Sequence, residues 1–326
     1  MLPVTYQDVL DALPRVHEVL DETALYEWPG LSEMLGCQLY LKHENHQPVG
    51  AFKIRGGINL IGALSAEERA AGILGCSTGN HGQSLAFAAK HYGVNCTIVV
   101  PERNNPGKNA AIKHLGATLI EHGPDFDEAR EHAEKLQLQH GFRYVHSANE
   151  PKLIAGVGSM ACEIFAKLPD PDVILVPIGL GSGVCGTSIV AKHVRPETEV
   201  IGVQAERASA VAQSWQAGKP VSTPSADTWA EGMATRISAE MTLEIMRQLM
   251  DDVILVGENE LRLAVYNIMK HTHNLAEGAG AATLAAVAQQ KSRFAGKTVV
   301  CILSGGNLDL AELPEILEVG QAADKS

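Results

Sequence analysis

A lysine beside an aromatic residue is the first group in the sequence with the potential for covalent chemistry. Lys53 stands in the segment Gly50-Ala-Phe-Lys-Ile-Arg-Gly-Gly57, where it follows a Pro-Val-Gly turn and opens a predicted helix. A lysine amine with its ordinary pKa of about 10.4 is a poor nucleophile, whereas a dry pocket lowers the pKa and activates the amine. By itself such a lysine is more often a solvated surface charge, so the segment needs partners before it indicates a reactive amine.

A glycine-rich loop is the second candidate, and it suits a phosphate. The apolar run Val173 to Ile178 leads into Gly179-Leu-Gly-Ser-Gly183 and then into a predicted helix. Backbone N–H groups at a helix N-terminus bind anions, and glycine lets a phosphate approach closely. The run Gly181-Ser-Gly-Val-Cys-Gly186, with Glu206 about 20 residues further on, also fits a dinucleotide-binding fingerprint. The loop therefore predicts phosphate binding and leaves open a nicotinamide dehydrogenase, another phosphate-bearing cofactor, or a turn that only packs helix against strand.

Two further polar segments follow apolar runs. Ser77-Thr-Gly-Asn-His-Gly-Gln83 lies between the apolar run Gly72 to Cys76 and an alanine-rich stretch, so its hydroxyl, amide and N–H groups at a helix start suit a carboxylate or a simple helix cap. The run Val299 to Leu303 ends in Ser304-Gly-Gly-Asn307. The last segment alone is a weak signal.

The elements that must position these groups predict an α/β fold. Short β-branched runs alternate with stretches of helical period, which is typical of a mostly parallel sheet covered by helices. The predicted strands are 38–42, 72–76, 95–100, 118–120, 173–177, 199–203, 252–256 and 298–303, and the predicted helices include 83–92, 108–115, 126–140, 153–167 and 259–273. Polar loops at 43–50 and 146–151 are candidate crossovers between domains. They divide the chain into a small inserted domain (48–146) and a large cofactor-binding domain (1–47 with 147–326), whereas 220–235 is interpreted as merely an irregular loop.

Composition excludes several classes of protein. The 326 residues are 45% hydrophobic and carry a formal net charge of -12, which disfavours nucleic acid as a partner. No apolar run approaches the roughly 20 residues of a membrane-spanning helix. The first residues, with Asp8 and Asp11, do not resemble a signal peptide, so we expect a cytoplasmic enzyme without membrane contact. The six cysteines form no C-x-x-C pair and are interpreted as reduced structural thiols.

In this order and spacing the motifs resemble the fold-type-II pyridoxal 5'-phosphate enzymes, and most closely the threonine/serine dehydratase and serine racemase branch. The resemblance covers nearly the whole chain, through Leu39-Tyr-Leu-Lys-His-Glu-Asn, Phe52-Lys-Ile-Arg-Gly, Ser77 to Gln83, Leu153-Ile-Ala-Gly-Val-Gly, the glycine loop, Glu277-Gly-Ala-Gly-Ala and Ser304-Gly-Gly-Asn. It implies two open, twisted, mostly parallel sheets covered by helices, as in the tryptophan synthase β chain, with the small domain closing over the substrate. It also implies a homodimer.

The resemblance assigns cofactor contacts residue by residue. It implies that Lys53 forms the Schiff base with pyridoxal 5'-phosphate, that Phe52 lies near the ring and that Asn80 bonds the ring hydroxyl. Ser304 would face the pyridine nitrogen as a neutral partner, which favours expulsion of a β-substituent. The phosphate cradle would be Gly179, Leu180, Gly181, Ser182 and Gly183.

The implied substrate residues are Ser77, Thr78, Asn80 and His81, around the carboxylate of a small amino acid. Lys53 would also remove the Cα proton, so the predicted activity is an ammonia-lyase that takes water and then ammonia from threonine, serine or 3-hydroxyaspartate. Thr78 stands where racemases of this branch place a serine acid/base, so racemisation remains the alternative, and a nicotinamide dehydrogenase is a distant one. Gln204 and alanines stand where those racemases bind a cation, so no metal is expected unless Glu206 substitutes.

Overall fold

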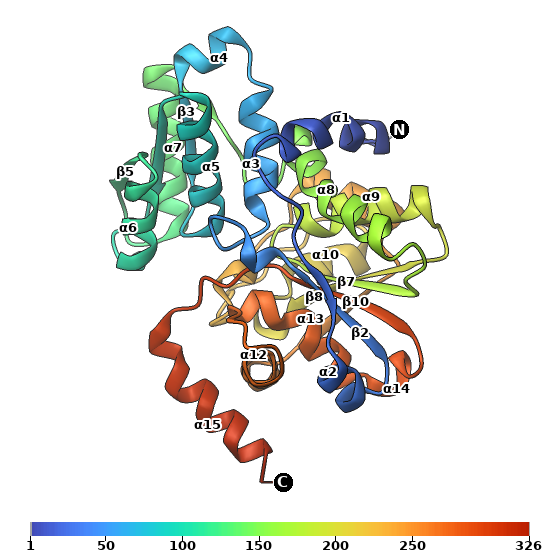
Figure 1. Ribbon diagram of the computed structural model, residues 1–326. Coiled ribbons are helices and arrows are strands. Elements are labelled where there is room, and N and C mark those ends of the chain that lie inside the picture. Colours follow the sequence, from blue (N-terminus) through green and yellow to red (C-terminus); the bar gives the residue numbers. More distant parts are fainter. Residues whose placement is uncertain (1, 326) are drawn as a thin grey trace.

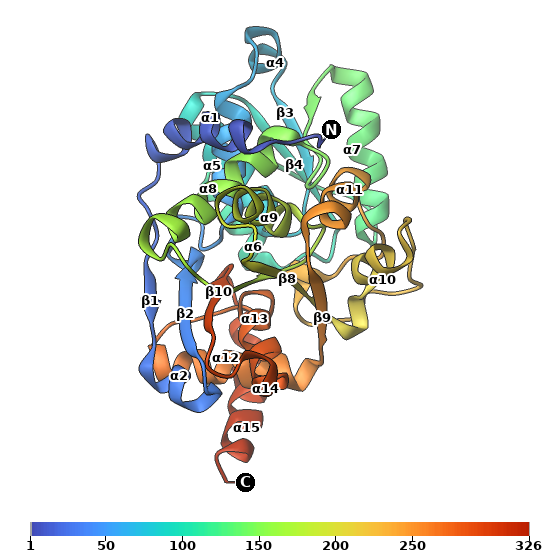
Figure 2. The same cartoon turned by 90° about the vertical axis from the view of Figure 1, so that its right-hand side faces the viewer.

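The computed structural model describes residues 2–325 and contains two separate sheets, each flanked by helices (Figures 1 and 2). The predicted α/β class with two mostly parallel sheets is confirmed. The larger sheet has the order β1-β2-β10-β7-β8-β9 and is parallel except for the β1–β2 pair. Its strands are β1 (Leu25–Glu27), β2 (Gln38–His43), β10 (Thr298–Leu303), β7 (Val173–Pro177), β8 (Glu199–Ala205) and β9 (Asp252–Val256).

Both faces of the larger sheet are buried, as its continuous apolar strands require. Along β7, Ile174 and Val176 join the core beneath helices α8 (Pro151–Lys167) and α9 (Ser182–Val194). Val173 and Leu175 point to the other core, beneath α12 (Glu258–Thr272) and α13 (Gly278–Gln289). Side chains of a strand alternate between faces, so a strand covered on both sides reads as an unbroken apolar run.

The smaller sheet has the order β5-β4-β3-β6, and all of its pairs are parallel. Its strands are β3 (Ile73–Cys76), β4 (Cys96–Val100), β5 (Thr118–Glu121) and β6 (Arg143–Tyr144), so all lie between residues 73 and 144. Helix α5 (Asn80–Tyr92) covers one face, and α7 (Phe126–His140) covers the other. Helices α4 (Ala66–Ala71) and α6 (Pro106–His114) complete this half.

Helix α3 (Lys53–Gly62) joins the two halves, since it packs between α5 and α8 (Figure 1). Two glycines allow the close approach. A Cβ at Gly57 would lie 2.4 Å from Ser84 Oγ of α5, and a Cβ at Gly56 would lie 2.6 Å from Leu153 of α8. The residue that opens this helix is Lys53, so its position depends on both halves.

The predicted elements agree with the structure within about three residues at each end, but several elements were not predicted. The short strands β1 and β6 have no apolar alternation of their own. Helix α1 (Tyr6–His17) has a signal that went unused, namely the capping box formed by Thr5 and Asp8. The remaining helices are α2 (Pro29–Leu35), α10 (Ala210–Ala217), α11 (Glu240–Leu249), α14 (Lys291–Phe294) and α15 (Leu313–Ala323), with short 3-10 turns at 44–46, 206–208, 231–233 and 310–312. No helix within residues 2–325 is long and apolar enough to cross a membrane.

Candidate active site

A short backbone pairing places Lys53 beside the end of β10. Ala51 forms an isolated antiparallel bridge with Gly305. The N–H of Phe52 donates to the carbonyl of Ser304 at 3.0 Å, which fixes the residue before Lys53 against the strand end. Two segments about 250 residues apart in the sequence therefore meet, and the predicted lysine and serine lie at one site.

The Lys53 amine sits in surroundings that favour its neutral form. Its Nζ lies 5.0 Å from the centroid of the Phe52 ring, and its backbone carbonyl accepts a hydrogen bond from Ser84 Oγ at 2.6 Å. Burial lowers the pKa of Lys53 to about 8, against the opposing effect of the nearby Glu277 carboxylate. A large fraction of the amine is thus unprotonated just above neutral pH, as a nucleophile or base requires.

The glycine loop forms an anion cradle at the start of α9. Gly181 has φ 101°, a left-handed conformation that favours glycine, and no side chain caps the helix. The first N–H groups of an α-helix have no partner within it, so those of α9 remain available to a phosphate. A hydrogen bond from Thr242 Oγ1 to the Leu180 carbonyl, at 2.6 Å, fixes the loop to α11. A Cβ at Gly179 would lie 2.5 Å from the Gly232 carbonyl, so only glycine fits there.

These parts line one cleft. All nine residues predicted to hold the cofactor lie on its wall. Its lining residues are Phe52, Lys53, Asn80, Pro177, Gly179, Leu180, Gly181, Ser182, Gly183, Gly232, Met233, Glu277, Ala279 and Ser304.

Three of the predicted substrate residues are absent from that wall: Ser77 and Thr78 lie in the loop before α5, and His81 lies in the first turn of the helix. Ser77 Oγ accepts hydrogen bonds from the N–H groups of Gly79 and Gly82, at 3.3 and 3.0 Å. Thr78 is partly buried in the same loop. Burial, with a smaller contribution from the positive charge of Lys53, lowers the pKa of His81 to about 3, so its imidazole is neutral.

Glu277 is a site residue that the sequence reasoning missed. It precedes α13, and its Oε1 accepts a hydrogen bond from Asn80 Nδ2 at 2.7 Å. Asn307 Nδ2 in turn donates to Asn80 Oδ1 at 2.8 Å. Burial raises the pKa of Glu277, while Lys108 and Asn80 act in the opposite direction. The motif that begins with Glu277 was noted, but nothing in its composition indicated that the carboxylate faces the reactive lysine.

The segment 220–235 is irregular apart from the 3-10 turn at 231–233, as predicted, and it also contributes to the site. Gly232 and Met233 form part of the cleft wall, and Glu231 makes an ion pair with Lys108 of α6 across the opening. Asn105 Nδ2 also crosses between the two halves and donates to Asp309 Oδ2 at 2.7 Å. The contribution of this loop depends on long-range packing, so its local sequence carried no signal.

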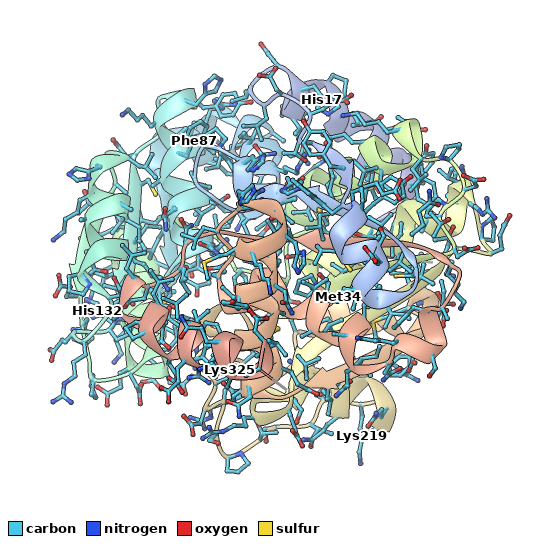
Figure 3. All side chains as sticks on the ribbon, turned by 60° about the horizontal axis from the view of Figure 1, so that its bottom comes forward. His17, Met34, Phe87, His132, Lys219 and Lys325 are labelled. Carbon is cyan, nitrogen blue, oxygen red and sulfur yellow. The ribbon has the colours of Figure 1, made fainter. Side chains whose placement is uncertain are left out.

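Beneath Lys53, α3 is anchored by a buried ionic network. The Arg55 guanidinium donates to both oxygens of Glu44, at 2.7 and 2.9 Å, and to both oxygens of Glu163, at 2.5 and 2.8 Å. Lys42 also pairs with Glu163. His17, labelled in Figure 3, reaches the network from a position that is 33% exposed, with its Nε2 3.0 Å from Glu163 Oε1.

The acidic residue of the nicotinamide hypothesis and the residues of the metal hypothesis lie elsewhere. Glu206 follows β8 in a 3-10 turn and does not line this cleft. Gln204 is fully buried, and its Oε1 accepts from the N–H of Ala212 in α10 at 2.9 Å. Among the described residues, no cluster of three or more His, Cys, Asp or Glu is placed to hold a metal ion.

Comparison with known proteins identifies close relatives of this arrangement. A family model described as pyridoxal-phosphate dependent enzyme matches residues 17–305. L-threonine ammonia-lyase of Thermotoga maritima is 38% identical over 317 residues, which cover 97% of this chain and 79% of that enzyme. L-threo-3-hydroxyaspartate ammonia-lyase of Saccharomyces cerevisiae is 34% identical over 310 residues, which cover 95% of each chain.

Solved structures agree with these sequence matches. The processed form of threonine deaminase isoform 2 from Solanum lycopersicum has a TM-score of 0.92 and 31% identity, covering 96% of this chain and 92% of that one. Maize serine racemase has a TM-score of 0.91 and 29% identity, covering 99% of both chains. The cleft fits the cofactor of such enzymes, because it combines a buried amine of lowered pKa with an uncapped helix N-terminus whose glycine at 179 leaves no room for a Cβ.

Proposed function

Because the chain belongs to the family of pyridoxal-phosphate-dependent enzymes, we propose that it is a lyase acting on a β-hydroxy amino acid of the threonine, serine or 3-hydroxyaspartate type. The β-hydroxyl leaves as water, and the released enamine takes up water to give a 2-oxo acid and ammonia. The observation that carries this proposal is the position of the Lys53 amine, which opens on the same cleft as the glycine cradle and Ser304. The ammonia-lyase names of the relatives support the same reaction.

The residues of the cleft have distinct tasks in holding pyridoxal 5'-phosphate. Lys53 would bind it covalently as a Schiff base, and the N–H groups of the loop 179–183 would hold its phosphate. Asn80, fixed by Glu277 and Asn307, would bond the ring hydroxyl, and Phe52 would lie against the ring. When bound, the cofactor withdraws electrons from the Cα of the amino acid and so acidifies its proton.

Lys53 also serves as the base in this proposal. Its amine would take the proton from Cα of the bound amino acid. Burial lowers the pKa of Lys53 to about 8, so near neutral pH the unprotonated fraction of this amine is far larger than that of a solvated lysine. Ser304 places a neutral hydroxyl at the strand end beside the cleft, where a carboxylate would keep the pyridine nitrogen protonated.

The substrate carboxylate is proposed to lie at the start of α5. The helix N-terminus attracts an anion, and Gly79 has no side chain to cap it. Ser77 Oγ accepts from the N–H of Gly82, so the N–H groups of Asn80 and His81 would receive the carboxylate. Ser77, Thr78, Asn80 and His81 surround this point. Ser77 keeps the loop in shape through its hydrogen bonds to backbone N–H groups.

Racemisation is a second candidate, supported by the similarity to solved racemases and by the hydroxyl of Thr78. A racemase needs a second acid/base on the opposite side of the substrate from Lys53, and Thr78 would supply it. Its β-branched side chain has restricted χ1 rotation, which limits its reach.

The assembly and placement of the enzyme are also proposals. Residues 48–146 would act as a small domain that closes over the substrate, and 1–47 with 147–326 would hold the cofactor. The polar contacts from Lys108 and Asn105 to the other half would be made on closure. We further propose that the enzyme is cytoplasmic and, as the family resemblance implies, a homodimer.

The proposed function is tested by supplying the purified protein with pyridoxal phosphate and a panel of β-hydroxy amino acids. The expected result is a 2-oxo acid and ammonia in equal amounts, with enantiomer analysis reporting any racemisation. Lys53→Ala is expected to reduce turnover by at least about 1,000-fold, because the base and the covalent anchor are lost together. Lys113→Ala, which changes an exposed lysine on α6, is the matched control. Absence of a 2-oxo acid with every substrate would refute the proposal.

A further inference from the structure

A second cleft opens beside the cofactor cleft, and four of its five charged side chains are acidic. The two clefts share Gly232, Glu277 and Ala279, so groups of a substrate that extend beyond the cofactor would meet the second one. Its charged lining residues are Lys108, Glu231, Glu277, Asp309 and Glu312.

Lys108 is the only basic residue that lines either cleft besides Lys53, among the residues that the structure describes. Its stem lies at the start of α5, since a Cβ at Gly79 would be 3.6 Å from Lys108 Cδ and 4.0 Å from Nζ. The Nζ already pairs with the Glu231 carboxylate. The Lys108 side chain is 14% exposed and that of Glu231 is 50% exposed. The pair therefore connects α6 of the small half with the loop after α10 at the mouth of the second cleft, which we call the opening.

The other basic groups that would suit an acidic side chain are committed elsewhere. Arg236 is exposed, lines neither cleft, and has its Nη1 3.4 Å from Asp127 Oδ2. His146 Nδ1 accepts hydrogen bonds from the N–H groups of Ala148 and Asn149, both at 3.0 Å. Burial also lowers the pKa of His146, which keeps its ring uncharged at neutral pH.

We infer that Glu231 neutralises Lys108 and thereby makes the opening select against substrates whose side chain carries a carboxylate. A second carboxylate would meet Glu277, Asp309 and Glu312, and like charges brought together disfavour binding. Arg262 lies 3.9 Å from Glu312 but pairs more closely with Glu315, at 2.9 Å, and does not line the cleft. The inference deepens the proposed function and rests on it. The preferred substrate class is neutral β-hydroxy amino acids of the threonine and serine type, rather than 3-hydroxyaspartate.

The test compares kcat/KM of the holoenzyme for L-threonine and for L-threo-3-hydroxyaspartate. We expect the wild type to prefer L-threonine and Glu231→Gln to shift the ratio toward the acidic substrate by about tenfold, because Lys108 is released. Glu312→Gln removes an equal charge from the same cleft without releasing Lys108, so its shift should be about twofold. In Lys108→Gln/Glu231→Gln, the tenfold shift should disappear.

A binding measurement separates charge selection from turnover. Calorimetric titration of the holoenzyme would use malate, a dicarboxylate, and 3-hydroxybutyrate, a monocarboxylate of the same chain length, neither of which has an amine to react. Glu231→Gln should tighten malate binding by about tenfold and leave 3-hydroxybutyrate within about twofold.

The possible outcomes separate the inference from the proposed function. If no β-hydroxy amino acid is turned over, the proposed function fails. If L-threonine is turned over but Glu231→Gln changes both substrates equally, the ion pair is only a clasp between the two halves and the inference is wrong. Equal tightening of malate and 3-hydroxybutyrate would place Lys108 at the carboxylate shared by both and would also overturn the inference.

Discussion

Two ionic clusters flank Lys53, and they use the same residue types in opposite settings. In the network beneath α3, the side chains of Lys42, Glu44, Arg55 and Glu163 are at most 1% exposed. Each carboxylate there receives several hydrogen bonds from cations. Burial alone would raise the pKa of Glu163. The Arg55 and Lys42 charges lower this pKa to about 2.

The second cluster, at the opening, consists of Lys108, Glu231, Glu277, Asp309 and Glu312. It differs from the buried network in both burial and charge balance. Its ion pair between Lys108 and Glu231 is partly solvated, and Asp309 and Glu312 add negative charge nearby. A closed, balanced network fixes a helix, because breaking it leaves a buried charge without a partner. An open, unbalanced cluster contributes little to stability and instead acts on charged ligands. Burial and pairing, rather than residue type, separate the two roles.

The largest expected effect comes from breaking the buried network. Glu163→Gln leaves two buried cations facing the single carboxylate of Glu44, so we expect a loss of about 3–5 kcal/mol in the free energy of unfolding. Denaturant unfolding followed by tryptophan fluorescence measures it.

Two further variants make that result specific. Lys42→Met/Glu163→Gln restores charge balance and should recover most of the lost stability. Glu231→Gln, in the opening, should cost less than about 1 kcal/mol because its partner pair is partly solvated. Equal losses in Glu163→Gln and Glu231→Gln would remove the distinction between the two clusters.

A smaller effect is expected on the titration of Lys53, which depends on Glu277 of the opening and not on the network. The Lys53 amine, with its pKa lowered to about 8, gains reactivity as the pH rises through that value and loses it as the pH falls. Glu277→Gln removes the carboxylate that raises this pKa, so the midpoint should move to lower pH. The rate of pyridoxal phosphate uptake by the cofactor-free protein, measured against pH, reports the midpoint.

The control for this titration is Lys42→Met/Glu163→Gln, whose midpoint should stay at the wild-type pH. The cofactor's own titration is common to all variants, so only the difference between variants matters. A midpoint that shifts in Lys42→Met/Glu163→Gln and stays unchanged in Glu277→Gln would contradict this account. The pKa of Lys53 would then depend on the buried network and not on Glu277.

The sequence predicted the parts of the fold and site that depend on local pattern. Apolar runs such as 173–177 and 298–303 predicted their strands at the observed bounds, because burial on both faces leaves an unbroken apolar stretch. The glycine loop was predictable for a similar reason, since a left-handed φ at Gly181 requires that residue type.

The parts that were missed depend on contacts between distant segments. Glu277 faces Asn80 across 197 positions of sequence, and Glu231 meets Lys108 across 123. Neither carboxylate lies in a local pattern that distinguishes it from a solvated surface charge. The buried partners of Arg55 were likewise invisible, because its ion pairs join α3 to the 3-10 turn at 44–46 and to α8 only after the two halves pack.

The most direct test of the central claim is to locate the lysine that carries the cofactor. The holoenzyme would be treated with borohydride, which makes the carbon–nitrogen bond permanent, and its peptides analysed by mass spectrometry. We expect the added mass of the cofactor on Lys53 and on no other lysine, Lys108 included. Labelling at Lys108, or no labelled lysine at all, would contradict the account.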